Sequence, residues 1–127
     1  MKKSILIIAF FMAAINYSHA DVFEDIINQL KNGNATGVAK YFNQSIELTI
    51  LETEGVYSKQ QAEMMLRRFI NSNQPKNVAL QHKGASSKGA MYAIAIYESS
   101  GGRYRTYIFM KDSGNGMMIN ELRIERD

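Results

Sequence analysis

The 127-residue chain contains no cysteine, which excludes disulfide bonds. A bacterial lipoprotein anchor is excluded as well, because it requires a cysteine directly after the apolar part of the leader. A small exported domain without disulfides has to be held together by core packing. Histidine is also scarce, with only His19 and His82. No histidine or acidic spacing fits zinc or calcium, so we expect no metal site.

Long hydrophobic runs are missing too. The longest apolar run, residues 5–15, is shorter than the roughly 20 residues that a membrane-spanning helix needs. It follows Lys2 and Lys3 and precedes a polar stretch with the small residues Ser18 and Ala20. This pattern is typical of a cleavable signal peptide, residues 1–20, although a retained membrane anchor is the alternative. We therefore expect residues 21–127 to be exported, soluble, without a membrane span, in the periplasm or outside the cell.

Without the leader, the chain also lacks a strong excess of either positive or negative charge. Removal of Lys2 and Lys3 leaves 13 basic and 12 acidic residues, a net charge of +1. A domain this close to neutrality is not an electrostatic nucleic-acid binder. The remaining 107 residues are enough for a single domain with one hydrophobic core.

Three helices are predicted in the first half of the chain. Apolar residues at helical spacing predict a first helix from Asp21, and Asn34 starts a short second helix over residues 35–42. Ser58 begins the clearest helix, because it can form a capping box with Gln61. The apolar stripe of that helix consists of Ala62, Met65, Leu66, Phe69 and Ile70. The helix is predicted to end before Pro75, which restricts the preceding residue.

Strands are predicted at residues 45–52, followed by a turn at 54–55, and throughout the second half. The later strands are separated by glycine-rich turns and cover residues 78–82, 91–98, 103–111 and 117–125. Helices first and strands last predict an α+β domain with an antiparallel meander, covered by helices on one face.

Two of these strands are apolar on both faces. In the strand at 91–98, Tyr92, Ile94 and Ile96 point to one face, and the residues between them are apolar as well. The strand at 103–111 also has apolar residues on both faces. The uncovered face of such a sheet is normally polar. Two explanations stay open: the second face is buried in a homodimer, or curvature folds both faces into one core.

The order of these elements resembles the nuclear transport factor 2-like, cystatin-like fold. The residues that carry the resemblance to a family of exported, uncharacterised bacterial domains with this fold are 57–62, 66–69, 92–95, 102–107 and 122–125. The resemblance covers residues 21–127. It implies a cone in which a curved antiparallel sheet wraps around the long helix, with two shorter N-terminal helices and a pocket. It brings no established catalytic residues, and the wider fold includes isomerases, dehydratases and non-catalytic modules.

Few residues are candidates for chemistry. His82 is a weak catalytic candidate, since it continues the face of Val78 and Leu80 toward the cone interior, and Glu52 and Glu98 are further acid–base candidates. An isolated histidine without an orienting carboxylate is more often a partly solvated strand residue. The glycine-rich turns lack the lysine and the following helix of a phosphate loop, so we expect no cofactor.

Tyrosine is the most abundant aromatic residue and suits the wall of an apolar pocket. The candidate ligand-binding residues are Tyr57, Tyr92, Tyr97 and Tyr107, although core or interface packing is the more common role. The first hypothesis is a non-enzymatic binding or interaction module for a small apolar ligand, a peptide or a protein partner, acting as a homodimer through the sheet. The alternatives are an isomerase- or hydrolase-like enzyme that uses His82 or a glutamate with a tyrosine, and a structural dimer in an envelope assembly.

Overall fold

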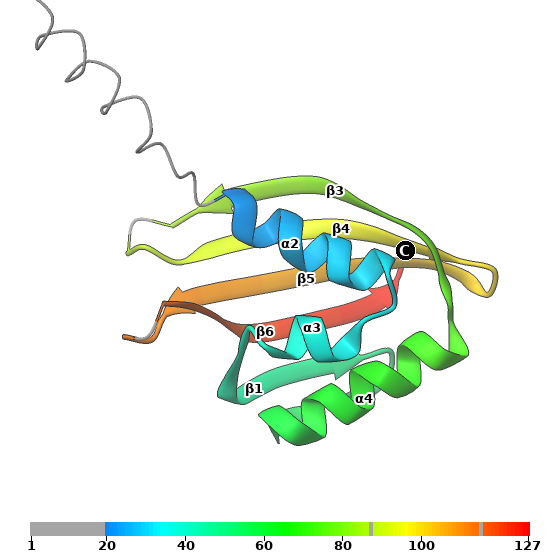
Figure 1. The fold of residues 1–127 in the computed structure, drawn as a ribbon, viewed down its shortest axis with the longest axis horizontal. Coiled ribbons are helices and arrows are strands. Elements are labelled where there is room, and N and C mark those ends of the chain that lie inside the picture. The colour runs from blue at the N-terminus through cyan, green and yellow to red at the C-terminus, as the bar shows by residue number, and fades with distance from the viewer. Residues whose placement is uncertain (1–19, 87, 115) are drawn as a thin grey trace, which may run out of the picture.

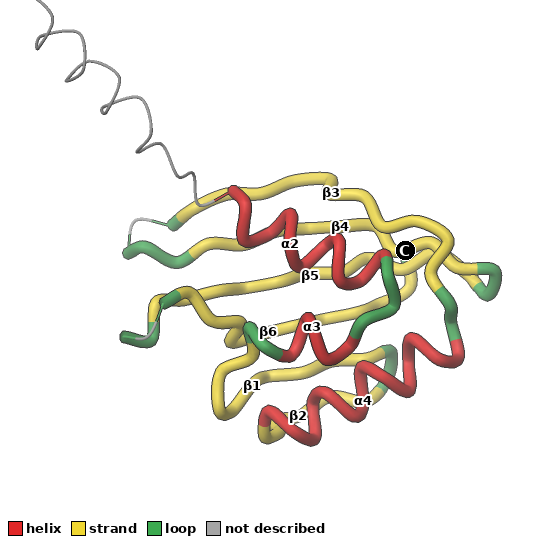
Figure 2. Tube along the Cα trace, in the orientation of Figure 1, coloured by secondary structure: helices red, strands yellow, loops and turns green. Residues whose placement is uncertain are grey.

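The computed structural model describes residues 20–86, 88–114 and 116–127, so most of the predicted signal peptide lies outside the described residues. The described part is an α+β domain in which three helices accompany a six-stranded sheet (Figure 1 and Figure 2). The helices are α2 (Ala20–Lys31), α3 (Ala35–Ala39) and α4 (Lys59–Ser72). The strands are β1 (Phe42–Ile50), β2 (Thr53–Ser58), β3 (Pro75–Ala85), β4 (Met91–Ser99), β5 (Gly102–Asp112) and β6 (Met117–Arg126).

The sheet has the strand order β2-β1-β6-β5-β4-β3. Its neighbours are antiparallel except for β1 and β6, which run parallel, so the prediction of a purely antiparallel sheet is wrong at this pair. The reason is that the chain leaves the sheet after the β1–β2 hairpin, passes through α4 and adds three strands before β6 returns beside β1. Such long-range pairing leaves no mark on the local sequence pattern.

Strand β2 was not predicted. The turn expected at residues 54–55 lies earlier, at Leu51 and Glu52, and Gly55 pairs with Leu48 inside the β1–β2 ladder. Leu51 has a φ of 57°, in the left-handed region that glycine and asparagine normally occupy. A leucine there costs about 1–2 kcal/mol. Its amide donates to the carbonyl oxygen of Ile124 at 2.8 Å, which holds the turn against β6.

All three helices lie on one face of the sheet (Figure 1). Helix α2 packs on β3, whereas α4 packs on β1, β2 and α3. Helix α4 covers the β1–β2 edge of the sheet and α2 covers the β3 edge, and Phe69 of α4 reaches Tyr97 and Tyr104 on the central strands. Two helices of similar length, 14 and 12 residues, are used because one helix is too narrow to cover six strands.

Helix α4 begins and ends as its sequence predicts. Ser58 and Gln61 form the capping box, with the Ser58 hydroxyl accepting from the Gln61 amide at 3.2 Å. Four residues of the predicted stripe are buried, while Met65 is only half-buried. The buried Phe69 packs its ring edge-on against Tyr104, with ring centroids 5.0 Å apart.

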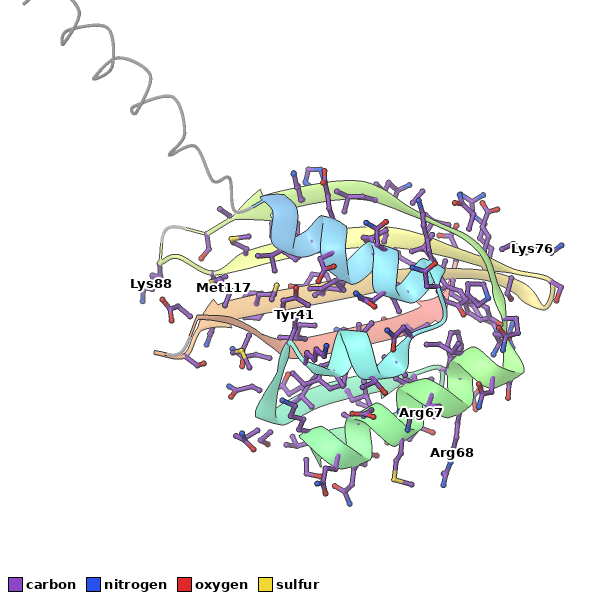
Figure 3. All side chains as sticks on the ribbon, in the orientation of Figure 1. Tyr41, Arg67, Arg68, Lys76, Lys88 and Met117 are labelled. Carbon is purple, nitrogen blue, oxygen red and sulfur yellow. The ribbon has the colours of Figure 1, made fainter. Side chains whose placement is uncertain are left out.

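Asn73 joins the C-terminus of α4 to the centre of the sheet. Its carbonyl oxygen accepts a hydrogen bond from the Tyr97 hydroxyl at 2.5 Å, and its side-chain oxygen accepts one from the Tyr104 hydroxyl at 2.8 Å. Burial raises the pKa of Tyr97 to about 12, and the neighbouring Tyr104 adds to the shift. Tyr41, near α2 and α3 (Figure 3), has its pKa raised to about 12 by its hydrogen bond to Asp25.

A first prediction concerns Thr106, which is fully buried on the helix side of β5. Its hydroxyl has no hydrogen-bond partner among the described residues. Replacing it with valine removes an unpaired polar group from the core, so Thr106→Val is expected to raise the free energy of unfolding by about 1 kcal/mol. Thermal unfolding followed by circular dichroism would then shift upward by about 4–8 °C. A lower Tm would contradict the prediction and indicate a partner for the hydroxyl.

A second prediction concerns pH. The unfolded chain releases the Tyr97 proton near its ordinary pKa of 10.0, whereas the folded protein keeps it until about 12. Stability is therefore complete below pH 10 and falls between pH 10 and 12, because the unfolded state binds fewer protons there. Tyr97→Phe removes the hydrogen bond to Asn73 and is expected to cost about 1 kcal/mol at neutral pH.

Denaturant titrations from neutral pH to pH 12 should show the difference between wild type and Tyr97→Phe shrinking above pH 10. The free energy of unfolding still falls with pH in both proteins, because the pKa of Tyr41 is also raised to about 12. A constant difference over this range would show that the Tyr97 hydroxyl is not shielded from water.

Candidate functional site

His82 lies on the face of the sheet opposite to the one expected. Leu80 pairs with Ala95, but His82 pairs with Ile94, so Gln81 is the extra residue of a β-bulge. The bulge turns His82 away from the helices and leaves it exposed. A one-residue shift of this kind moves a side chain to the other face without changing the sequence pattern. The interior orientation considered for His82 is therefore wrong, and its exposure agrees with the solvated strand histidine favoured from the sequence.

The structure brings His82 together with two of the four candidate tyrosines. The Nε2 atom of His82 is 3.0 Å from the Tyr92 hydroxyl, and the rings of Tyr92 and Tyr107 are stacked with centroids 6.4 Å apart. Burial raises the pKa of Tyr107, and the nearby Glu121 adds to the shift. These three aromatic side chains form a row across β3, β4 and β5.

Aliphatic and aromatic residues continue this row into an apolar surface, which we call the outer patch. It consists of Tyr92, Ile94, Ile96, Tyr107 and Phe109, which share the face opposite to the helices. Ile96 is only 6 % exposed, yet it does not belong to the core cluster beneath the helices. Ile96 and its neighbours on this face therefore lie apart from the cluster under the helices.

The other two candidate tyrosines lie elsewhere. Tyr97 is fully buried in the core. Tyr57 is half-buried on the helix side of β2, where its ring covers Gly55. Of the acid–base candidates, Glu98 lies 3.5 Å from Arg103 in a well-exposed ion pair. The four tyrosines therefore do not line a common pocket, because the interior of the domain is filled by side chains.

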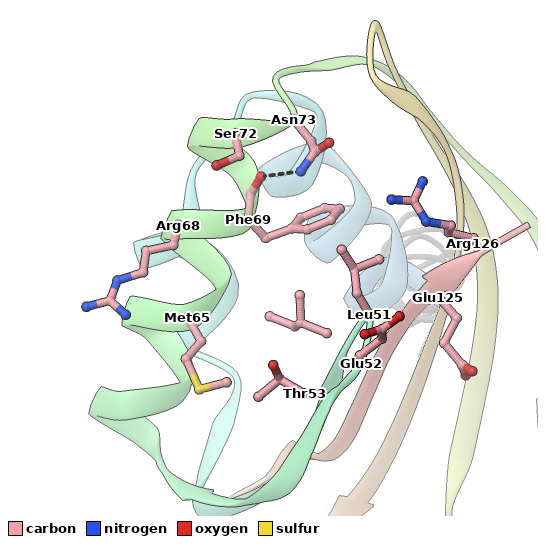
Figure 4. A pocket seen from close by; sticks show the side chains of 11 residues that line it. Leu51, Glu52, Thr53, Met65, Arg68, Phe69, Ser72, Asn73, Glu125 and Arg126 are labelled. Atoms are coloured by element: carbon pink, nitrogen blue, oxygen red, sulfur yellow. Dashed lines mark hydrogen bonds between the residues drawn. The ribbon is translucent and has the colours of Figure 1, made fainter.

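A cleft of about 930 Å³ lies at another place, between α4, the β1–β2 turn and the end of β6 (Figure 4). Its apolar lining consists of Ile50, Leu51, Met65 and Phe69. Its polar lining consists of Glu52, Thr53, Arg68, Ser72, Asn73, Glu125 and Arg126. Among the residues singled out from the sequence for chemistry, Glu52 lines this cleft. The other lining residues were not predicted as site residues, because the sequence pattern placed the turn after Leu51 too late in the chain and did not indicate β2.

Within residues 20–86, 88–114 and 116–127, no three histidine or acidic side chains come together in a way that could hold a metal ion. Among the same residues, no helix has the length and apolar character to cross a membrane.

A curved six-stranded sheet with helices on one face places this chain in the cystatin-like, nuclear transport factor 2-like class of α+β domains. Within that class the chain belongs to the DUF4783 family, a domain of unknown function, whose match covers residues 23–125. The resemblance inferred from the sequence is thereby confirmed.

Solved structures agree with this assignment. A DUF4783 family protein from Bacteroides uniformis has a TM-score of 0.77 at 23 % identity and covers 82 % of this chain and 95 % of its own. One from Bacteroides ovatus has a TM-score of 0.76 at 21 % identity, with 81 % and 93 % covered. A domain with a cystatin-like fold from Nostoc punctiforme has a TM-score of 0.67 at 12 % identity, with 87 % and 80 % covered. No curated protein matches the chain. At these identities the likeness establishes the fold alone.

A third prediction tests the geometry of the outer patch. Gly84 lies directly under the Tyr92 ring, and a Cβ atom there would come within 2.6 Å of Tyr92 Cε1. Gly84→Ala is therefore expected to swing the Tyr92 ring outward and to break its hydrogen bond with His82. Nuclear Overhauser contacts between the His82 and Tyr92 rings should disappear, while contacts in the core stay unchanged. Persisting contacts between the two rings would contradict this arrangement.

Proposed function

We propose that this protein is an exported, non-enzymatic interaction module that pairs with a second copy of itself through the outer patch. The observation that carries the proposal is a contiguous apolar and aromatic surface on the sheet face that none of the described helices covers. Contiguous apolar surfaces of this kind mark interaction sites in soluble proteins. Tyrosine and phenylalanine are also enriched at such interfaces.

The size of the sheet face suits a homodimer. The whole face of the sheet, six strands about 4.8 Å apart and about nine residues long, spans roughly 850 Å², and the outer patch forms the part of it over β4 and β5. Stable interfaces bury about 800 Å² on each partner. A second copy is the simplest occupant, because an isologous dimer needs only this one surface.

The charges beside the outer patch favour a second copy over a strongly charged partner. Arg123 forms ion pairs with Glu125 at 3.2 Å and with Glu121 at 3.7 Å on β6. Arg105 lies beside Ile96 in the ladder and is exposed. An identical copy therefore meets charges of both signs rather than a repelling field of one sign.

The enzyme hypothesis rests on the hydrogen bond between His82 and Tyr92. A general base works in a site that encloses its substrate and excludes water. His82 is exposed on an open sheet face, and the cleft described above lies away from it. We therefore favour the interaction role. A structural dimer in an envelope assembly would use the same outer patch.

A fourth prediction follows for Ile94, near the middle of the outer patch. Ile94→Glu places a charge on this surface and is expected to convert a micromolar dimer into a monomer, because an unpaired charge is costly in a dry interface. Analytical ultracentrifugation of the purified protein measures the change. The far-UV circular dichroism spectrum should stay unchanged, since the side chain does not belong to the core cluster.

Met64→Glu is the matched control. Met64 is 50 % exposed on α4, on the helix side of the sheet, so the same added charge should leave the dimer intact. A wild-type monomer at high micromolar concentration would refute the proposal. Equal weakening of the dimer by both variants would place the contact on another surface.

A further inference from the structure

The cleft between α4 and the β1–β2 turn has the dimensions of a ligand site. Its volume of about 930 Å³ falls in the range of small-molecule pockets, about 300–1,000 Å³. It is lined by Met65 and Phe69 of α4, on the side of the sheet that carries the helices (Figure 4), whereas the outer patch lies on the opposite side. A ligand there would leave the surface proposed for dimerisation free.

The floor of the cleft is an open margin of the hydrophobic core, because Ile50, Leu51 and Met65 pack against the core cluster and Phe69 belongs to it. Met65 belongs to the buried stripe of α4, but it is only half-buried because the cleft lies in front of it. Leu51 holds its backbone in the left-handed region, and its side chain lines the same space as Phe69. A glycine would adopt that turn without strain, but it would remove part of the apolar lining.

One end of the cleft carries an available cation. Arg67, Arg103 and Arg123 each lie within 3.2 Å of a carboxylate oxygen. In contrast, Arg126 forms no ion pair among the described residues, and its guanidinium carbon lies 5.7 Å from the centre of the Tyr104 ring. Figure 4 shows the guanidinium group directed toward the cleft. Contact with an aromatic ring orders the arginine while leaving its N–H groups free to donate.

The other charges of the lining restrict the ligand to one negative group. Glu125 is already bound to Arg123, and Arg68 leaves α4 on the far side of the cleft, pointing away from it in Figure 4. Glu52 forms no ion pair among the described residues, so it disfavours a second carboxylate. The lining therefore offers one arginine above an apolar floor.

We propose that this cleft binds a medium-chain aliphatic monocarboxylate. The alkyl chain lies on Leu51, Met65 and Phe69, and the carboxylate accepts hydrogen bonds from the guanidinium of Arg126. Arginine suits this role because its planar fork matches both oxygens of a carboxylate. The alkyl chain supplies affinity by removing apolar surface from water.

Octanoate is the probe, measured by isothermal titration calorimetry on the purified protein. Octanol has the same chain without the charge and is expected to bind about tenfold more weakly, because it lacks the charge-assisted hydrogen bonds. Acetate has the charge without the chain and is expected not to bind measurably. Amide shifts in ¹H–¹⁵N spectra with octanoate should centre on residues 50–53, 65–73 and 125–126.

Two variants separate the parts of the site. Arg126→Gln should lower octanoate affinity about tenfold and leave octanol unchanged, which a loss of folding would not do. Arg105→Gln, on the opposite face, is the matched control and should change neither. Leu51→Asn keeps a residue that tolerates the left-handed conformation and should weaken octanoate and octanol by the same factor.

The proposal is overturned if octanoate shows no saturable binding at millimolar concentration, or if octanol binds as tightly as octanoate. Unchanged octanoate affinity in Arg126→Gln would overturn it as well, as would amide shifts confined to the outer patch. A peptide with a C-terminal leucine serves as a further arm of the titration. If that peptide binds more tightly than octanoate, the assignment to a small aliphatic acid is wrong.

Discussion

The attachment of α4 to the sheet through Asn73 is the interaction on which the rest of the structure depends. The backbone carbonyl oxygen of Asn73 accepts a hydrogen bond from the Tyr97 hydroxyl, and its side-chain oxygen accepts one from the Tyr104 hydroxyl. Its side-chain nitrogen donates a hydrogen bond to the carbonyl oxygen of Phe69 at 3.1 Å. These bonds tie the C-terminus of the helix to β4 and β5 in the interior, where each buried polar group needs a partner. They hold α4 at an angle across the β1–β2 edge, and the cleft is the space that this position leaves.

Two of the register shifts in the sheet decide which side chains of β3 and β6 each face presents. One lies at Gln81 in β3, and the other at Asn120, where the β5–β6 register shifts. Bulges bend strands and increase their twist, which accounts for the curvature of the sheet. They also change which side chains point toward the helices. The bulge at Gln81 leaves His82 beside Tyr92, and thereby turns a candidate catalytic residue into part of an aromatic surface.

The two surfaces proposed for function lie on opposite sides of one sheet. The outer patch uses the side chains of β4 and β5 that point away from the helices, and the cleft uses the side chains of α4 and the β1–β2 turn that point toward the sheet edge. They share no residue, so self-association and ligand binding are energetically separable. This separation fits a fold whose members carry unrelated functions on the same scaffold.

The sequence by itself determined the features that depend on neighbours along the chain. These are the capping box at Ser58, the buried stripe of α4, its end before Pro75, the glycine-rich turns and the family resemblance. Only the tertiary structure decided the parallel β1–β6 pair, strand β2, the face of His82 and the cleft. The physical reason is that local periodicity specifies the type of an element and its buried side. Strand pairing, bulges and the gaps between packed elements depend on contacts between residues far apart in the chain.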